Sequence, residues 1–242
     1  MKVVPPLSPP ISALVLAGGM GTRLRSVVSD RPKPMALVNG VPFIQLLIES
    51  LAAKGIRDFV LLVGYMAEVI ESHFKEHSGK KFTIRFSREQ TPLGTGGAVK
   101  KSEAFATDPS LLVNGDTFFD GDVEALLRFH NEKAADVTLS LLPVDDVSRY
   151  GSVTTDEDGK ITGFREKHEG NRGPGLINAG FSVISKEFVR GLPENRAFSM
   201  EREIFPLLAG SGRMFGLTMN RPFFDIGTPE SYDAFKKFIC GG

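Results

Sequence analysis

The first residues that could do chemistry form a glycine loop near the N-terminus. An apolar run over residues 11–17 leads into Gly18-Gly19-Met20-Gly21-Thr22, and Arg23 and Lys33 follow. Glycine backbones can adopt positive φ and approach a bulky group closely, so their N–H groups can point at phosphate oxygens. Two cations at fixed offsets would supply the counter-charge of a polyphosphate. The pattern indicates a nucleoside triphosphate site.

Other phosphate-binding loops fit this stretch less well. No Gly-Lys-Ser/Thr follows at the spacing of a Walker A loop, and Leu24 stands where the third glycine of a dinucleotide fingerprint belongs. A lone Gly-x-Gly more often marks a tight turn, but Pro32 and Pro34 restrict the backbone around Lys33, as expected if its side chain must be held toward a phosphate. A dehydrogenase is therefore disfavoured.

Charge and composition limit the partners. Lys plus Arg and Asp plus Glu both number 29, so there is no basic field to hold nucleic acid by phosphate neutralisation. Cys240 is the only cysteine, no run approaches the ~20 apolar residues that span a bilayer, and prolines interrupt residues 1–10. We expect a soluble cytoplasmic protein that binds neither nucleic acid nor a membrane, and a homo-oligomer stays open.

Strand and helix patterns alternate through the first half of the chain. A proline at the start and a glycine after the end mark a helix over 43–54, and apolar runs closed by polar or glycine residues mark buried strands. This alternation predicts an α/β sheet with helices on both faces. The expected strands are 11–17, 59–63, 82–86, 111–113 and 137–144, and the expected helices are 43–54, 67–74, 123–130 and one reaching about 105 after a glycine turn at 94–97.

The second half changes style. Residues 152–164 read as a hairpin with Asp158-Gly159 in its turn, and strands are expected at 179–184 and 214–219. A helix is expected over 199–209, and Thr228 as N-cap with Pro229 at the first position begins a final helix. The whole chain, 1–242, is predicted to be one domain with a nucleotide-binding half at about 11–120 and a second half at about 121–242.

An ordered set of motifs makes the sequence resemble the nucleoside-triphosphate-dependent sugar-1-phosphate nucleotidyltransferases. The resemblance implies a Rossmann-like three-layer fold with a mixed, mostly parallel central sheet. Each motif alone is weak, but the ordered set is specific and covers nearly the whole chain. The motifs are residues 18–24 with 32–34, Pro92-Leu93-Gly94-Thr95-Gly96-Gly97-Ala98, Asn114-Gly115-Asp116, Tyr150-Gly151, Phe164-Arg165-Glu166-Lys167, Asn178-Ala179-Gly180 and Asp225-Ile226-Gly227-Thr228-Pro229.

Roles follow from the resemblance position by position. Arg23, Lys33 and Lys167 are implied as the catalytic cations, and Asp116 and Asp225 as ligands of Mg²⁺, a metal that usually takes one or two carboxylates. Alone, either acid would read as a strand-end or turn residue, so the two carboxylates should lie close enough to share one ion. The family often has a proline after the lysine where this chain has a histidine.

The resemblance also implies two sets of binding residues. Nucleotidyl transfer joins them: an ionised sugar-1-phosphate oxygen attacks the α-phosphorus in line, pyrophosphate leaves, and no general base is required. The nucleotide set is Leu16, Ala17, Gly18, Gly19, Met20, Gly21, Thr22, Glu89, Pro92, Gly94 and Thr95, and the sugar-phosphate set is Tyr150, Gly151, Glu166, Lys167, Asn178 and Glu201.

The base is read from one position. Related thymidylyltransferases carry Gln three positions before the Pro-x-Gly turn, where this chain has Glu89. A carboxylate only accepts hydrogen bonds, and guanine offers adjacent N1–H and N2–H₂ donors, whereas uracil and thymine offer one donor beside two acceptors. Glu89 therefore favours GTP, unless Gln90 is the reader or Glu89 is a solvated charge.

Short sequence runs outside the main motifs indicate the acceptor sugar. The length, Phe119 and the runs 32–36, 148–151 and 198–201 resemble the D-glycero-D-manno-heptose 1-phosphate guanylyltransferases, which supply GDP-heptose for surface polysaccharide such as capsule or lipopolysaccharide. Glu201 is expected to face the sugar, although an acid after the N-cap candidate Ser199 also suits a helix dipole. The alternatives are a mannose-1-phosphate guanylyltransferase, an N-acetylmuramate-1-phosphate uridylyltransferase, or a catalytically silent nucleotide-sensing subunit.

Overall fold

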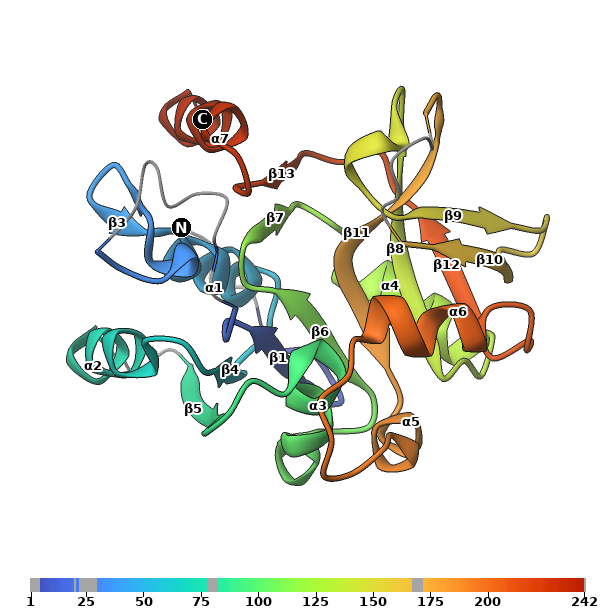
Figure 1. Cartoon of the computed structure of the whole chain (residues 1–242), viewed down its shortest axis with the longest axis horizontal. Coiled ribbons are helices and arrows are strands. Elements are labelled where there is room, and N and C mark those ends of the chain that lie inside the picture. Colours follow the sequence, from blue (N-terminus) through green and yellow to red (C-terminus); the bar gives the residue numbers. More distant parts are fainter. Residues whose placement is uncertain (1–4, 20, 22–29, 78–81, 167–171, 242) are drawn as a thin grey trace.

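The fold is seen in a computed structural model that describes residues 5–19, 21, 30–77, 82–166 and 172–241 (Figure 1). The described residues form a mixed sheet in the order β10-β9-β11-β6-β1-β4-β5, with β8 paired to β11 and to β12. Its strands are β1 Ser12–Leu16, β4 Asp58–Val63, β5 Thr83–Arg88, β6 Ser110–Asn114, β8 Val137–Val144, β9 Ser152–Thr155, β10 Ile161–Arg165, β11 Gly175–Ile184 and β12 Met214–Thr218.

The sheet changes direction at β11. In the first half, β6, β1, β4 and β5 run parallel to one another, while β11 is antiparallel to β6, β8 and β9. Strands β1, β4 and β6 are almost fully buried because helices cover both of their faces, which explains their continuous apolar runs, whereas the edge strand β5 is partly exposed. The predicted α/β fold with a mixed central sheet is confirmed.

Two hydrophobic clusters make the three layers. One face carries α1 Phe43–Ala53, α2 Ala67–His77, α4 Val123–Glu132 and α7 Pro229–Cys240, whose buried side chains join one cluster. The other face carries α3 Gly94–Lys101, α5 Lys186–Gly191, the π-helix η5 Met200–Ile204 and α6 Phe205–Leu208. Each helix buries one apolar stripe against the sheet, as amphipathic helices do.

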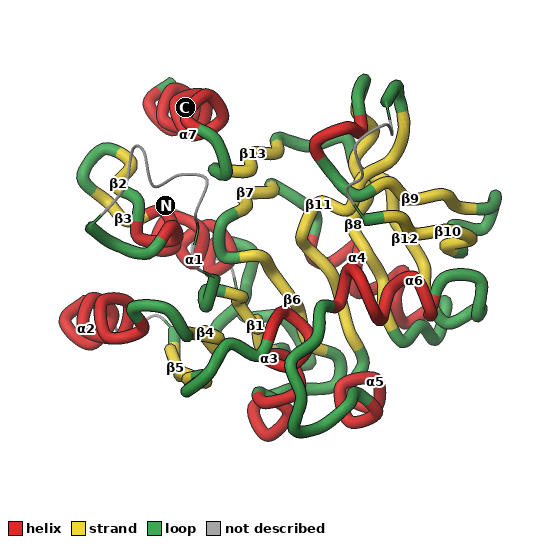
Figure 2. The backbone as a smooth tube through the Cα atoms, viewed as in Figure 1, coloured by secondary structure: helices red, strands yellow, loops and turns green. Residues whose placement is uncertain are grey.

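A small second sheet links distant parts of the chain. β7 Thr117–Phe119 pairs antiparallel with β13 Phe223–Asp225, so Asp225 lies opposite Thr117. Figure 2 shows this pair between the end of β6 and α7. Short β2 Leu37–Val38 and β3 Val41–Pro42 form another two-stranded sheet. Neither β7, β13 nor α5 was expected from the sequence, because each is too short to show a periodic pattern.

Two expectations about the second set of helices are wrong. Residues 94–97 are the first turn of α3 rather than a separate turn, and residues 199–209 do not form one α-helix. Pro206 has no N–H to donate four residues back and stands in the first turn of α6, so the helical segment divides into η5 and α6 at this point. The N-caps hold as expected: Ser199 Oγ accepts from Arg202 N–H and Thr228 Oγ1 from Ser231 N–H.

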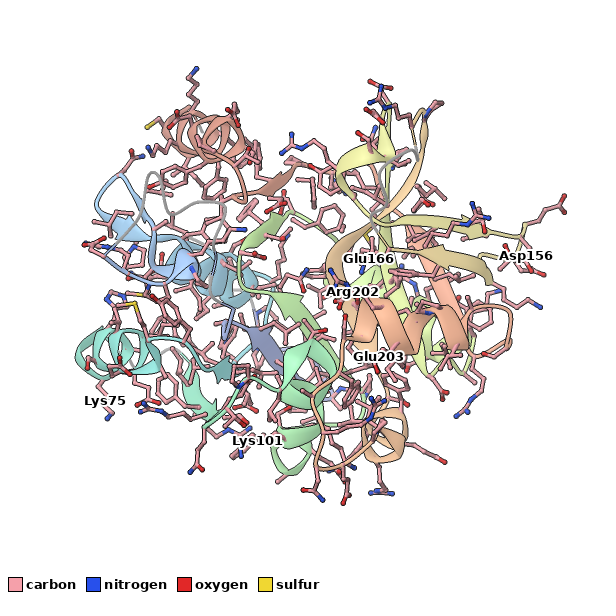
Figure 3. The ribbon with its side chains drawn as sticks, in the orientation of Figure 1. Lys75, Lys101, Asp156, Glu166, Arg202 and Glu203 are labelled. Carbon is pink, nitrogen blue, oxygen red and sulfur yellow. The ribbon has the colours of Figure 1, made fainter. Side chains whose placement is uncertain are left out.

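The remaining expected elements are present with small shifts of their ends. The 152–164 hairpin forms from β9 and β10, and Asp156 Oδ1 accepts from the N–H groups of Asp158 and Lys160 within its turn. In Figure 3, Asp156 in this turn and Lys75 on α2 lie at opposite ends of the molecule, and Glu166 and Arg202 lie between them. No helix among the described residues is both long enough and apolar enough to cross a membrane.

Candidate functional site

The site is a cavity of about 570 Å³ at the carboxyl ends of three parallel strands. β1 lies between β4 and β6, with Leu16 opposite Leu62 and Asn114, so all three strands end at the same edge. This is the edge where open α/β sheets bind their ligands. Nine residues of the expected nucleotide set line the cavity: Leu16, Ala17, Gly18, Gly19, Gly21, Glu89, Pro92, Gly94 and Thr95.

Two glycines allow the strand ends to meet closely. The N–H of Tyr65 donates to the carbonyl of Gly18 at 3.2 Å, and a Cβ on Gly18 would lie 3.3 Å from the nitrogen of Gly64. A Cβ on Gly21, whose φ is +56°, would lie 2.5 Å from Cβ of Lys33. The glycine loop therefore packs directly against the lysine that the sequence placed beside a triphosphate.

Lys33 joins the two acids. It begins the short 3₁₀ helix η2 Lys33–Met35, its side chain is only 8% exposed, and its Nζ contacts Asp116 Oδ2 at 2.7 Å and Asp225 Oδ1 at 3.3 Å. Pairing of β7 with β13 brings the acids together, and the N–H of Ile226 donates to the carbonyl of Asp116 at 3.1 Å. The two acids, far apart in sequence, therefore both contact Lys33, and their sharing of one metal ion stays a prediction.

The acid pair suits a hard divalent cation. Asp116 and Asp225 offer carboxylate oxygens, and Asp225 Oδ1 also accepts from the N–H of Gly227 at 2.8 Å, which fixes its orientation. Among the described residues there is no cluster of three or more His, Cys, Asp or Glu side chains that could hold a metal alone. Two carboxylates completed by phosphate and water oxygens are the usual protein share of an Mg²⁺ site, so the residues fit that ion.

Glu89 forms part of the opposite wall. Its Oε2 accepts from the N–H of Leu93 at 3.0 Å, and its carboxylate lies over Gly18 and Gly64, where an added Cβ would come within 3.4 and 3.5 Å of its oxygens. Partial burial raises the pKa of the Glu89 carboxyl, opposed by the Leu93 hydrogen bond and the charge of Lys101. Glu89 is therefore not a solvated surface charge. Gln90 also lines the cavity, so that alternative stays open.

Only one described residue of the expected sugar-phosphate set lines the cavity. Glu201 lines the same cavity, whereas Tyr150, Gly151, Glu166 and Asn178 do not. Gly151 lies against the 165–166 segment, where a Cβ would meet the carbonyl of Arg165 at 3.1 Å. Asn178 Oδ1 accepts from the N–H of Gly180, and the Tyr150 ring packs edge-on against Phe223 at 5.6 Å. Their role toward a sugar phosphate stays a prediction.

Four of the expected site residues are not described by the structure, and several residues that line the cavity were not expected. Met20, Thr22, Arg23 and Lys167 fall outside the described residues. Pro34, Ala98 and Asn114 line the cavity and belong to the quoted motifs, but they were given no site role; Leu62, Gly64, Tyr65 and Thr91 were missed by sequence reasoning. The signal for Leu62 and Gly64 was available, because they end the expected strand 59–63 and neighbouring parallel strands end at one edge.

Comparisons with known proteins settle the class. Residues 12–241 match the nucleotidyl transferase family. The chain belongs to this family. As a nucleotidyltransferase it is 38% identical over 229 residues to a D-glycero-alpha-D-manno-heptose 1-phosphate guanylyltransferase of Campylobacter jejuni, covering 93% of this chain and 98% of that protein. It is 37% identical to a mannose-1-phosphate guanylyltransferase of Mycobacterium tuberculosis, covering 92% of this chain but only 62% of that longer relative.

Solved structures confirm the nucleotidyltransferase fold. HddC from Yersinia pseudotuberculosis superposes with a TM-score of 0.85 at 33% identity, covering 95% of this chain and 99% of that one. HddC complexed with GMP-PN gives a TM-score of 0.83 at 34% identity, covering 94% and 99%. The Rossmann-like three-layer fold implied by the sequence motifs is therefore shown over nearly the whole chain.

Proposed function

We propose that this nucleotidyltransferase transfers GMP from GTP to D-glycero-α-D-manno-heptose 1-phosphate, giving GDP-heptose and pyrophosphate for surface polysaccharide synthesis. The observation that carries the proposal is a cavity lined by a glycine loop, the acceptor-only side chain of Glu89, Asp116 and Lys33, whose Nζ also contacts Asp225 outside the lining. The match along nearly the full length of a named heptose 1-phosphate guanylyltransferase supports it. We further propose that the reaction takes place in the cytoplasm.

The chemistry is the joining of two anions. An oxygen of the sugar 1-phosphate bonds to the α-phosphorus, the bond from that phosphorus to the bridging oxygen of the β-phosphate breaks, and pyrophosphate leaves with the electron pair. The nucleophile is already ionised at neutral pH, so the protein supplies position and positive charge. We assign this role to Lys33, which the structure places in the cavity wall, and to Arg23 and Lys167 from the sequence.

A divalent ion fits beside Lys33. We propose that Asp116 and Asp225 hold Mg²⁺, which when bound neutralises phosphate charge. The chain's own contribution is orientation: the Gly227 N–H fixes the Asp225 carboxylate, and Lys33 keeps the two acids together. The glycine loop and Thr95 would bind the triphosphate side of the nucleotide.

Glu89 is proposed to read the base. Its Oε2 is engaged by Leu93 N–H but retains a further lone pair, and its Oε1 accepts no hydrogen bond from the described residues. Guanine presents N1–H and N2–H₂ as neighbouring donors, which a carboxylate accepts. The uracil edge presents a carbonyl on each side of its one donor, and these lone pairs repel a carboxylate. This arrangement favours GTP over UTP.

The heptose is favoured over other acceptors by the length of the match. The chain covers 98% and 97% of two heptose 1-phosphate guanylyltransferases but 62% of the mannose-1-phosphate enzymes it resembles. Mannose 1-phosphate is the second candidate, because the M. tuberculosis relative that carries that name is 37% identical. A nucleotide-sensing subunit without catalysis is disfavoured, since Lys33 and both acids are retained and assembled.

Acceptor assays test this proposal. Pyrophosphate release with GTP and Mg²⁺ is measured with D-glycero-α-D-manno-heptose 1-phosphate, mannose 1-phosphate and glucose 1-phosphate, and with UTP and N-acetylmuramate 1-phosphate. We expect the highest kcat/KM with the heptose. Faster turnover of mannose 1-phosphate would refute the heptose assignment, activity with UTP alone would refute the guanylyl assignment, and silence with every pair would refute the enzyme.

A further inference from the structure

A segment of the second half crosses the beginning of α3. Phe198 N–H donates to the carbonyl of Leu93 at 2.9 Å, and Gly96 N–H donates to the carbonyl of Phe198 at 3.0 Å. A Cβ on Gly94 would lie 2.4 Å from Phe198 O, and one on Gly96 would lie 2.1 Å from the Phe198 ring. The glycines of a nucleotide-binding motif are therefore required by the close approach of residues 196–200.

Side chains complete this contact. Thr95 Oγ1 donates to Glu201 Oε2 at 2.7 Å and accepts from Met200 N–H at 2.9 Å. Ser199 Oγ donates to the same Glu201 Oε2 at 2.9 Å and accepts from Arg202 N–H at 3.2 Å. Two hydroxyl protons thus converge on one carboxylate oxygen, and each hydroxyl is itself oriented by a backbone donor. We call Thr95, Ser199 and Glu201 the hydroxyl clamp.

The clamp fixes a carboxylate at the cavity wall. Among the described lining residues, Glu201 alone comes from the chain beyond Asp116, so it is where the second half enters the nucleotide cavity. Glu201 Oε1 accepts no hydrogen bond from the described residues. Glu201 belongs to the π-helix η5, and π-helical turns, although rare in proteins as a whole, often occur at functional sites. A carboxylate oxygen held this way suits a hydroxyl donor of a bound substrate.

We propose that Thr95 and Ser199 are positioning residues which hold Glu201 so that its Oε1 accepts a hydrogen bond from a substrate hydroxyl. This inference rests on the proposed function, because the hydroxyl belongs either to the ribose of GTP or to the acceptor sugar. It assigns to Thr95 a role through Glu201 in addition to any direct contact with the nucleotide. It also gives the two halves of the chain a shared binding residue.

Kinetics of matched variants test the clamp. Thr95→Val removes the hydroxyl and keeps the shape, and we expect a loss of about tenfold in kcat/KM, the usual effect of one charge-assisted hydrogen bond. Ser199→Ala should act in the same direction, and Thr95→Ser should restore activity. Thr162→Val is the control, because Thr162 is exposed on β10 and, within the described part of the chain, its hydroxyl contacts that of Thr154 alone, at 3.1 Å.

A double-mutant cycle separates positioning from mere support. If Thr95 acts through the Glu201 carboxylate, Thr95→Val should cost much less in a Glu201→Gln background than in the wild type. If Thr95 only supports the Met200 backbone, the two losses multiply and the inference is overturned. Urea unfolding of each variant shows whether it is folded under assay conditions, and Ser199→Ala in the same cycle with Glu201→Gln keeps the test available if Thr95→Val does not fold.

Deoxynucleotides identify the source of the hydroxyl. For a ribose contact, wild-type protein should bind 2′-deoxy-GTP or 3′-deoxy-GTP about tenfold more weakly than GTP, and Thr95→Val should lose that discrimination. For an acceptor contact, the variants should raise KM for the sugar phosphate alone. Unchanged kcat, KM and GTP affinity in both Thr95→Val and Ser199→Ala would overturn the clamp. A wild-type protein that neither binds GTP nor releases pyrophosphate would instead refute the proposed function.

Discussion

Replacement of Glu89 by glutamine should separate base selection from local structure. A glutamine side chain can still accept from Leu93 N–H through its amide oxygen, which turns its NH₂ group toward the place of Glu89 Oε1. That NH₂ would face two guanine donors. Charge-assisted hydrogen bonds contribute about 1.5–3 kcal/mol each, so a net loss of about 3 kcal/mol, or two orders of magnitude in kcat/KM for GTP, is expected.

The same Glu89→Gln replacement should raise the free energy of unfolding although it lowers activity. Burial raises the pKa of Glu89 above its ordinary value of 4.5, so the folded protein holds this proton more tightly than the unfolded chain does. The ionised side chain therefore costs stability as pH rises from the unfolded pKa through the folded one. Glu89→Gln removes that cost, so its free energy of unfolding should exceed that of the wild type at pH 7 and lose this advantage near pH 4.

The assay compares initial rates of pyrophosphate release with GTP and with UTP for the wild type, Glu89→Gln and the control Glu157→Gln. Glu157 lies in the exposed β9–β10 turn, away from the cavity. We expect the GTP-to-UTP ratio of kcat/KM to fall about a hundredfold in Glu89→Gln alone. An unchanged ratio with normal stability would refute the assignment of base reading to Glu89 and direct attention to Gln90.

Three further predictions concern stability. Lys33→Met should abolish transfer and, with a chelator present, lower the free energy of unfolding by about 2 kcal/mol, because Asp116 and Asp225 then face each other without their cation. Mg²⁺ should raise the melting temperature of this variant more than that of the wild type. Equal increases in melting temperature would contradict the prediction. Burial lowers the pKa of His130 to about 4 although the charge of Asp108 opposes this, so the folded protein loses stability as pH falls below 6.5, the ordinary pKa of histidine. The free energy of unfolding, measured with urea, should fall by about 2 kcal/mol between pH 7 and pH 5. His130→Asn should make this fall smaller, and an equal fall in the variant would contradict the prediction. Gly96→Ala should lower the free energy of unfolding by about 1–3 kcal/mol although alanine favours helices, because its Cβ meets the Phe198 ring. Gly191→Ala is the control: a Cβ there meets no atom of the described residues within 4 Å, so this variant should be neutral or stabilising. A Gly96→Ala variant as stable as the wild type would refute the close packing.

Local patterns made much of the fold predictable. Strands β1, β4, β6 and β8 are buried on both faces, so their apolar runs stand out, and proline, glycine and threonine mark the ends of α1 and α7. The π-helix η5 and the β7–β13 pair could not be found this way. They depend on Pro206 and on contacts between segments about a hundred residues apart, which no local period records.

The site was predictable where it follows strand ends. The glycine loop, Glu89 and Asp116 each follow an expected strand, so their convergence on one edge was derivable. Family motifs supplied Asp225, because β13, the strand that ends at Asp225, is only three residues long. The role of the glycines at 94–97 was partly misjudged, since the approach of Phe198 that requires Gly94 and Gly96 is invisible without the fold.

The central claim is guanylyl transfer, and a competition experiment measures it directly. The protein is given equal concentrations of ATP, CTP, GTP and UTP with Mg²⁺ and D-glycero-α-D-manno-heptose 1-phosphate, and the nucleotide sugars formed are identified by mass spectrometry. The arrangement of Glu89, Lys33 and the two acids predicts GDP-heptose as the dominant product. A dominant UDP-, ADP- or CDP-heptose, or no nucleotide sugar at all, would contradict it.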